Sequence, residues 1–508
     1  MKIKNVLIVT ALLLVATTST QAQMVLTMDK AIDISIQSSP DLLSAELSLR
    51  RYEKLLSAQR ASLKTQFSLN VDPIDYSNER YMDTRLSEWY TNESFESSGT
   101  FSISQPVVIT GATVSLNNQF GWQSNTSAID SGTTTTSASF TNSLYLRIDQ
   151  PLFSYNETKY ELLTIELDYE DAKISYALTR LNLEQQIISQ FYSVYMAQQN
   201  LAVAQEEMED AQQNNDIISE KVRLDMVARS ESFQSELNLS DAESTLQTRM
   251  VSLESAKDQF KQLLGLPLNT DFVVDAEISD TSVTVDLDMA IDHALTNRLE
   301  LLQREIINEN ADIALKQIKD NNSFQGELSL SVGIMGDNSS FNHIYNTPTQ
   351  SPSVNLSFSI PIFDWGARKD RIAAQELQIS MNKVDEEQEL IDIEIEVLTS
   401  YRSLNNYIKQ IELAQKSVSN AQQTYDLNVE YYRAGEITGM EISEYQSQLS
   451  SQKTSLSQAM VDYKLELVNL KCITLYDFEK GEPISPMLMY STETMNKIEK
   501  YNKKLINK

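Results

Sequence analysis

The sequence predicts an α+β membrane protein in which long coiled-coil helices alternate with the strands of a lipid-facing β-barrel, and in which one structural plan occurs twice. Three observations predict this class. Short motifs recur at fixed offsets, apolar residues repeat every seven residues along very long segments, and other segments alternate apolar and polar residues. These patterns are typical of internal repeats, coiled coils and half-buried strands, respectively.

The N-terminus has the layout of an export signal. In this chain of 508 residues, Lys2 and Lys4 precede an apolar stretch over 6–16, and small and polar residues follow up to Ala22. This layout predicts a secretory signal peptide over residues 1–22. The apolar stretch has about half of the roughly 20 residues that a transmembrane helix needs. Because no other long apolar run follows, a membrane crossing would have to use strands.

Composition excludes several classes of protein. The chain has 71 acidic and 41 basic residues, a net charge of -30, which would repel nucleic acid. Its single cysteine, Cys472, cannot form an intramolecular disulfide, and its two histidines disfavour a histidine-based metal or acid/base centre. We therefore predict no cofactor, no nucleic-acid partner and no enzymatic activity.

Two offsets indicate a tandem duplication. At an offset of 259, residues 28–33 match 287–292, and at an offset of 210, residues 151–153 match 361–363. The offsets differ by 49, which predicts an insertion of that length in the first half, between about 66 and 146.

Each half is expected to contain a helix, strands, a very long helix, a turn and a shorter return helix. The first repeat is expected over 23–264, with strands in 66–149, a long helix over 160–223, a tip turn over 224–229 and a return helix over 230–264. A connector over 265–286 leads to the second repeat over 287–475, with strands in 325–360, a long helix over 368–432, a tip turn over 433–440, a return helix over 441–472, and then a tail over 476–508.

The long helices carry coiled-coil seams. Leu390, Val397 and Leu404 are seven residues apart, and Ile187 and Val194 occupy the matching places in the first half. A long helix of 64 residues would measure about 96 Å, whereas a return helix of 35 residues would measure about 52 Å. Two half-length helices placed end to end, one of them over 28–62 or 287–319, would therefore be needed to cover each long helix.

The strand segments alternate with a period of two. They are marked by Phe101 and Ile103; Val114 and Leu116; Leu144, Leu146 and Ile148; Leu328, Leu330, Val332 and Ile334; and Val354, Leu356, Phe358 and Ile360. Segments rich in Ser, Thr, Asn and Gly over 73–98, 121–139 and 336–352 are expected to be loops. Since every helix is committed to a seam, a barrel that lipid covers explains these strands better than a small soluble sandwich.

Several motifs resemble those of the TolC-type outer-membrane efflux proteins, the outer membrane factors. They are Pro151-Leu152-Phe153 and Pro361-Ile362-Phe363-Asp364-Trp365-Gly366, which would join strands to helices, and the turn over 431–437. Asp225 and Asn156 depart from the pattern, because the family usually has Gly near both places. By this resemblance, the residues expected at the strand–helix junctions are Pro151, Phe153, Pro361, Phe363 and Gly366.

This resemblance implies a homotrimer in which four strands per chain close a twelve-stranded barrel in the outer membrane, above a helical barrel that crosses the periplasm. It also implies a passive exit duct of a tripartite efflux or type I secretion system, fed by an inner-membrane pump through a periplasmic adaptor protein. The alternatives are a secreted or periplasmic coiled-coil rod without a pore, and a carboxylate-pair hydrolase. No Ser-His-Asp set, phosphate loop or metal-ligand spacing supports an enzyme.

The two tip turns are the candidate functional sites. The expected adaptor-docking residues are Asp225, Met226, Val227 and Ala228 in the first turn, and Arg433, Ala434, Gly435, Glu436 and Ile437 in the second. The expected acidic gate consists of Glu231, Glu441 and Glu444, braced by Tyr432. Glu441 and Glu444 share a helix face, and crowding of carboxylates around a threefold axis would favour cations and raise carboxylate pKa values. The competing interpretations are a plain helical hairpin and a solvated acidic face.

Overall fold

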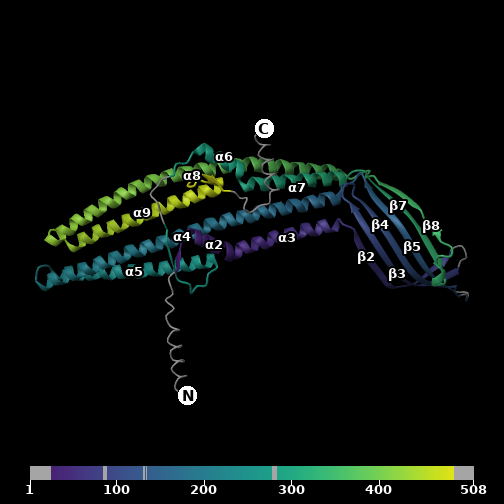
Figure 1. Cartoon of the computed structure of the whole chain (residues 1–508), viewed down its shortest axis with the longest axis horizontal. Helices are drawn as coiled ribbons and strands as arrows, with labels where there is room; N and C mark the ends of the chain where they lie inside the picture. Colours follow the sequence, from purple (N-terminus) through teal and green to yellow (C-terminus); the bar gives the residue numbers. More distant parts are fainter. Residues whose placement is uncertain (1–23, 84–87, 130–131, 133, 277–282, 485–508) are drawn as a thin grey trace, which may run out of the picture. The chain divides into compact units, whose positions relative to one another are not determined.

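A computed structural model describes residues 24–83, 88–129, 132, 134–276 and 283–484. The order of helices is the same in the two halves, with strands between the second and third helix of each half (Figure 1). The first half contains helices α2 (Met28–Ser38), α3 (Pro40–Ser62), α4 (Glu157–Arg223) and α5 (Arg229–Leu264); the second contains α6 (Leu287–Asn297), α7 (Leu299–Asn321), α8 (Ala367–Ala434) and α9 (Gly439–Thr474). The expected signal peptide and residues 485–508 of the expected tail lie outside the described residues.

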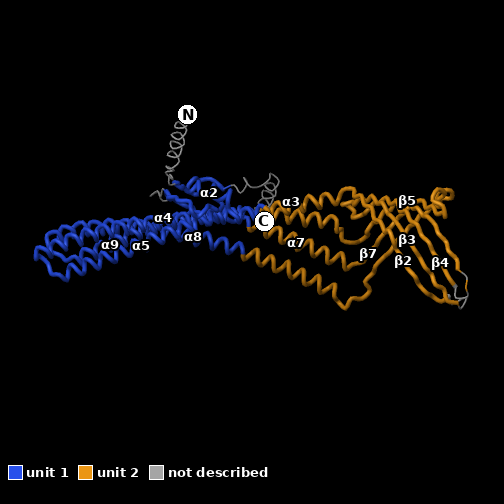
Figure 2. The backbone as a smooth tube through the Cα atoms, turned by 90° about the horizontal axis from the view of Figure 1, so that it is seen from below, with its two compact units in different colours: residues 1–46, 175–299, 389–508 blue, residues 47–174, 300–388 orange. Residues whose placement is uncertain are grey.

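The chain forms two compact units, each of which takes segments from both halves (Figure 2). Unit 1 consists of residues 1–46, 175–299 and 389–508, and unit 2 of residues 47–174 and 300–388. Helices α4 and α8 contribute to both units. The units therefore do not coincide with the two sequence repeats.

Unit 1 is helical, and its core follows the seven-residue seams. Ile187 and Val194 of α4, and Val397 and Leu404 of α8, are almost completely buried. Phe260 of α5 lies edge-on to Phe191 of α4, with ring centroids 6.2 Å apart. Each such aromatic pair adds about 0.5–1.5 kcal/mol beyond the burial of apolar area. The apolar seam residues predicted from the sequence thus form the core of this unit.

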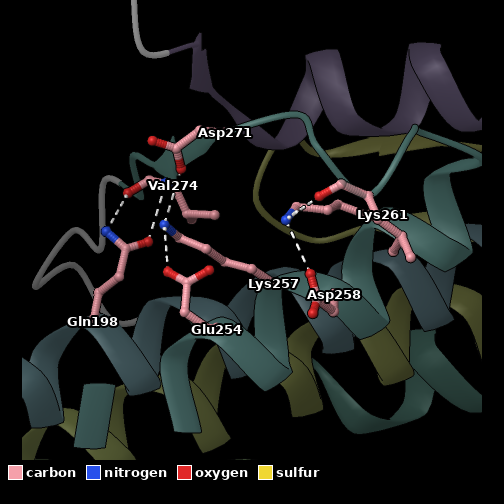
Figure 3. A network of polar contacts seen from close by, with 8 residues as sticks. Gln198, Glu254, Lys257, Asp258, Lys261, Asp271 and Val274 are labelled. Carbon is pink, nitrogen blue, oxygen red and sulfur yellow. Dashed lines mark hydrogen bonds and ion pairs between the residues drawn. The ribbon is translucent and has the colours of Figure 1, made fainter. Parts of the chain in front are cut away.

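Two buried lysines fasten the segment that follows α5 to the helices (Figure 3). Lys257 Nζ lies 3.2 Å from an Asp271 carboxylate oxygen, and Lys261 Nζ donates to the Leu268 carbonyl at 3.0 Å. The side chain of Gln198 on α4 both donates to the Val274 carbonyl and accepts from its N–H. These bonds hold strand β6 (Phe272–Val274), which pairs in parallel with β1 (Met24–Leu26). Because buried cations need partners, the network fixes the course of this connection.

The half-length helices are each divided in two. The expected helix over 28–62 breaks at Ser39, and the expected helix over 287–319 breaks at Arg298, the position that the larger repeat offset assigns to Ser39. Both residues have an extended backbone. Pro40 explains the first break, because a residue before proline is driven out of the helical region. The second break occurs before Leu299, so the position is retained without a proline.

Unit 2 contains an antiparallel sheet that the helices enter and leave at one end. Its strands are β2 (Gln66–Asp83), β3 (Glu88–Val107), β4 (Ala112–Ile129), β5 (Thr134–Leu152), β7 (Gln325–Asn338), β8 (Thr349–Gln350) and β9 (Ser353–Ser359), in the order β2-β3-β4-β5-β7 with β8 and β9 both beside β7. Residues 350 and 353 pair with residues 334 and 331 in one continuous register. Segments β8 and β9 are therefore one interrupted strand, and the described residues form six strand positions in this sheet.

The prediction of four strands per chain is therefore wrong for the described sheet. The expected loops over 73–98 and 121–139 are largely strand as well: β2 pairs with β3 as far as Asp83 and Glu88, and β4 pairs with β5 as far as Ala128 and Thr134. Backbone hydrogen bonds continue beyond the apolar positions, because ladder pairing does not require apolar side chains. Apolar alternation marks only the part of a strand that has one apolar face.

Candidate functional site

The sheet of unit 2 has one apolar and one polar face, and the two faces stay in phase across every strand. Leu69 pairs with Phe101, and Leu146 pairs with both Leu116 and Val332. Directly paired residues of antiparallel strands point to the same side of a sheet. One face therefore carries a continuous apolar band, although its side chains are exposed in the single chain: Leu69 by 66% and Val332 by 59%.

Aromatic clusters flank this band at both ends. At the end away from the helices, Phe120, Phe140 and Phe341 lie with ring centroids 5.6–6.3 Å apart. At the helix end, Phe324 stacks on Phe358 at 5.3 Å and contacts Phe153 at 5.4 Å. An apolar outer band between two aromatic girdles is the pattern of a strand wall that crosses a bilayer.

The opposite face is polar and hollowed. A cavity of about 400 Å³ lies on it, lined by side chains that include Gln119, Ser143, Tyr145, Arg147, Ser329 and Asn355. Arg147 Nε lies 2.8 Å from an Asp149 carboxylate oxygen, and Ser329 Oγ donates to the other oxygen at 2.6 Å. A water-filled lumen requires hydroxyl, amide and charged groups of this kind.

The predicted junction residues lie where strands meet helices. Pro151 is inside the β5 ladder, opposite Glu327, whereas Pro361 follows the end of β9. The pairing of β5 therefore continues past Pro151 as far as Leu152, opposite Gly326. Phe153 has φ 57° and Gly366 has φ 89°, so the backbone passes through the left-handed region at both junctions.

Different side chains begin the long helices at these junctions. The Asp364 carboxylate accepts from the N–H groups of Gly366 at 3.0 Å and Arg368 at 2.7 Å. These bonds lower the pKa of that exposed carboxyl. In the first half, Asn156 accepts from the Lys159 N–H at 3.1 Å. Each long helix therefore has an N-terminal acceptor for its unpaired N–H groups.

The two tip turns of unit 1 have the same backbone conformation. Asp225 has φ 57° and Gly435 has φ 79°, and the smaller repeat offset relates these two positions. In each turn the next N–H donates to a carbonyl five residues back, Met226 to Lys221 and Glu436 to Tyr431, both at 2.9 Å. This is the Schellman arrangement that ends helices at a left-handed residue. Asp225 thus takes the place of glycine without changing the turn.

The predicted docking residues are mostly exposed. Met226, Ala228, Arg433, Ala434, Gly435 and Glu436 are exposed, as is Asp225, and Val227 and Ile437 are half-buried. Ile437 packs against a small cluster formed by Ile218, Tyr432 and Ile442. The second turn is therefore backed by an apolar cluster that joins α4, α8 and α9, and its outer residues remain open to contact.

Tyr432 is buried at the second tip. Its ring lies 4.6 Å from Lys221 Nζ, which also donates to the Tyr432 carbonyl at 3.4 Å. Burial, followed by the nearby charge of Glu231, raises the pKa of the Tyr432 hydroxyl. That hydroxyl has no hydrogen-bond partner within the described part of this single chain.

The predicted gate carboxylates lie just after the two tip turns, Glu231 at the start of α5 and Glu441 and Glu444 at the start of α9. Glu441 and Glu444 are exposed, and Glu441 caps its own helix: its carboxylate accepts from the Thr438 N–H at 2.8 Å and from the Thr438 hydroxyl at 2.9 Å. These hydrogen bonds lower the pKa of the Glu441 carboxyl. Helix capping is thus a structural role that the sequence interpretation did not assign to this residue.

Another polar group lies between α4, α8 and α9. Tyr425 Oη donates to Asp210 Oδ2 at 3.2 Å, and Gln446 Nε2 donates to the same oxygen at 2.9 Å. Burial is the main cause that raises the pKa of the Asp210 carboxyl. No sequence signal reveals this group, because Asp210 is far from both of its partners along the chain.

The described residues include no helix long and apolar enough to cross a membrane. Within the same residues, no group of three or more His, Cys, Asp or Glu side chains is placed to hold a metal ion.

Comparison with known proteins shows which family and which folds this chain resembles. Residues 290–474 match the family model of the outer membrane efflux protein. No curated protein matches the chain. The predicted resemblance to TolC-type outer-membrane efflux proteins is confirmed by this match over part of the chain and by the shared fold.

The fold is that of several solved outer-membrane channels. The chain is similar to the CmeC outer membrane channel of Campylobacter jejuni, with a TM-score of 0.67, 14% identity, and 94% of this chain and 89% of that chain covered. It is also similar to the outer membrane protein VceC of Vibrio cholerae, with a TM-score of 0.64 and 12% identity. That match covers 90% of this chain and 97% of VceC. The MtrE outer membrane channel of Neisseria gonorrhoeae matches with a TM-score of 0.61 and 14% identity, and the match covers 88% of each chain.

Proposed function

We propose that this chain is the outer-membrane exit duct of a tripartite efflux or type I secretion system. It passively conducts substrates that an inner-membrane pump delivers through a periplasmic adaptor protein. The observation that carries this proposal is the two-faced sheet, whose uncovered apolar band suits lipid and whose polar, hollowed face suits a water-filled pore. The family match to outer membrane efflux proteins agrees with it.

Assembly as a homotrimer follows from surfaces that the single chain leaves uncovered. Strands β2 and β9 each have a strand partner on one side only among the described residues. An unpaired strand edge in lipid costs several kcal/mol per unsatisfied group. Helix α8 also exposes Leu377, Met381 and Val384 at coiled-coil spacing. Copies of the chain would cover both surfaces, and the family resemblance supplies the number three.

A tandem duplication explains why the two halves share irregularities of the backbone at matching positions, although these positions do not contact one another. The larger offset of the sequence motifs relates the helix breaks at Ser39 and Arg298, and the smaller offset relates the left-handed residues Asp225 and Gly435. Such matching irregularities are expected of duplicated segments and have no local cause in common.

The exposed tip residues are proposed to dock the adaptor. Their shared turn conformation gives six similar contact sites in a trimer, two per chain. Replacing Ala228 with Glu should abolish export, because a charge would be buried in the contact. Ser252→Glu, at another exposed position on α5, is the matched control. Normal export by the Ala228 variant, at equal trimer abundance, would remove the first tip from the docking surface.

The acidic gate remains a proposal about the assembled tips. Glu441 and Glu444 are exposed and so are free to face a threefold axis, and Glu231 is close enough to Tyr432 to affect its pKa. Opening would separate helices that Tyr432 and Lys221 join. The capping role of Glu441 is compatible with a gate role, because its second carboxylate oxygen has no capping partner in the described residues.

Purification from the outer membrane tests the proposed function. The protein should be extracted by detergent as a trimer and should form channels in planar lipid bilayers. A monomer found in the periplasmic fraction, or a trimer that forms no channel in any condition, would favour the alternative of a coiled-coil rod without a pore.

A further inference from the structure

The insertion in the first half has a definite location in the sheet. By the two repeat offsets, the start of β2 at Gln66 corresponds to the start of β7 at Gln325, and Pro151 near the end of β5 corresponds to Pro361 after β9. The second half has only two strand positions between these points, whereas the first has four. The hairpin β3–β4 is therefore the inserted segment.

This hairpin has the same relation to the sheet as the other strands. β3 pairs with β2 from Ser104 to Glu88, and β4 pairs with β5 from Thr113 to Ala128. Its residues Ile103 and Leu116 pair with each other and lie in the apolar band. A loop or lid outside the sheet would not need apolar and polar residues that alternate in phase with those of the neighbouring strands.

The turn of the hairpin is fastened at the helix end of the sheet. Asn156 Nδ2 donates to the Val108 carbonyl at 2.9 Å, and Gln150 Nε2 donates to the Thr110 carbonyl at 2.9 Å. Gln105 Nε2 donates to the Leu63 carbonyl, also at 2.9 Å. The hairpin is thus built in between the end of α3 and the start of α4. This gives Asn156 a role that glycine could not fill.

We propose that three copies of this chain close an eighteen-stranded barrel, in which the hairpin β3–β4 contributes two wall strands per chain and widens the outer-membrane pore. The inference rests on the trimer of the proposed function. It replaces the twelve strands that the family resemblance implies. The occupant of each open edge is a second copy of the chain, with β9 beside the β2 of its neighbour.

The internal repeat predicts the register of that contact. Within one chain, the last strand of the first half pairs with the first strand of the second half, Leu152 opposite Gly326. Applying the two offsets to this pair places Ile362 opposite Phe67 of the next chain. The same register places Ile360 opposite Leu69 and Ser359 opposite Asn70. Apolar residues then meet apolar residues, so the band continues across the contact.

Barrel geometry agrees with eighteen strands. With strands about 4.8 Å apart and tilted by about 40°, twelve strands give a circumference of about 75 Å and eighteen give about 113 Å. Four helices per chain, α3, α4, α7 and α8, join the strands. Twelve helices spaced by about 9 Å occupy about 108 Å. The circumference of the wider barrel therefore matches the width of the twelve helices, and its backbone diameter is about 1.5 times that of a twelve-stranded barrel.

Disulfide crosslinking tests the edge contact. Asn70→Cys and Ser359→Cys, combined in one chain with Cys472→Ser, should give covalent trimers under mild oxidation. Gln66→Cys with Ser359→Cys is the matched control, because it displaces one cysteine by four residues, or about 13 Å along the strand. The control pair should crosslink at least tenfold less.

Electron cryo-microscopy of the same trimer counts the strands. Eighteen wall strands with the Asn70–Ser359 crosslink support the inference. A trimer with twelve wall strands, and β3–β4 outside the wall, would overturn it while leaving the export duct intact. A protein that forms no trimer would overturn both the inference and the proposed function.

Discussion

A charge placed in the apolar band should be far more harmful than the same charge placed on the neighbouring polar face. Leu146 lies midway between the two aromatic clusters, six residues from the level of Phe140 and six from Leu152, and pairs with Leu116 and Val332. An arginine on the lipid face near the bilayer midplane costs about 2–4 kcal/mol. Since each 1.4 kcal/mol is tenfold in an equilibrium constant, Leu146→Arg should lower the folding equilibrium constant by about 30- to 700-fold per chain.

Ser143→Arg is the matched control, because Ser143 lies in the same strand but lines the polar cavity. Refolding of both variants into lipid vesicles, followed by the gel mobility of unheated samples, measures the folded trimer. The Ser143 variant should fold like the natural protein and change only ion selectivity. Equal folding yields for the two variants would refute the assignment of lipid and pore faces.

Three further predictions concern the helical unit. Gly435→Ala should lower the free energy of unfolding by about 1–2 kcal/mol, because the added Cβ meets no atom but the left-handed φ is strained. Asp225→Gly should raise the free energy of unfolding by up to about 1 kcal/mol, because glycine adopts this φ without strain. Denaturation of the two variants measures both changes. Burial raises the pKa of the Asp210 carboxyl in the folded state. The ionised carboxyl therefore destabilises the fold above that raised pKa, and the penalty decreases as pH falls from there toward the ordinary pKa of aspartate. Asp210→Asn should flatten the pH dependence of the melting temperature over this range, and an unchanged profile would contradict this. Glu441→Gln combined with Glu444→Gln should weaken cation selectivity in planar bilayers, and unchanged selectivity would exclude the acidic gate.

The pattern of the helices was accessible from sequence because it depends on local periodicity. The sequence predicts α8 over 368–432, and the helix spans Ala367–Ala434. Its seam residues Val397 and Leu404 are buried. A seven-residue repeat constrains a helix at every turn, so an error in one residue does not change the outcome. The divisions of the short helices at Ser39 and Arg298 were missed, since only the first has a proline beside it.

The extent of the sheet was underestimated because its strands are longer than their apolar band. Strand β3 begins at Glu88, in a segment rich in Ser, Thr and Glu that was expected to be a loop. Such residues can still pair in a ladder when both neighbouring strands are present, because β-propensity depends strongly on context. The difference between the two repeat offsets indicated an insertion, but its assignment to the wall depends on the long-range pairing of β3 and β4 that no local pattern shows.

The tip residues show what sequence could and could not reveal about the candidate site. The repeat offset placed Asp225 and Gly435 in equivalent turns, and both are left-handed. The capping of α9 by Glu441 follows the ordinary spacing of three residues from Thr438 and could have been predicted. The contact of Asp210 with Tyr425 joins two long helices, and it depends on their packing.

Cysteine scanning along β5 in intact outer-membrane vesicles tests the central claim most directly. Single cysteines at residues 143–148, in a Cys472→Ser background, would be challenged with a charged thiol reagent that cannot enter lipid. Positions 143, 145 and 147 should react, because they face the water-filled pore, and positions 144, 146 and 148 should not. Equal reactivity at all six positions, or reaction at the even positions only, would contradict a membrane wall with its polar face toward a pore.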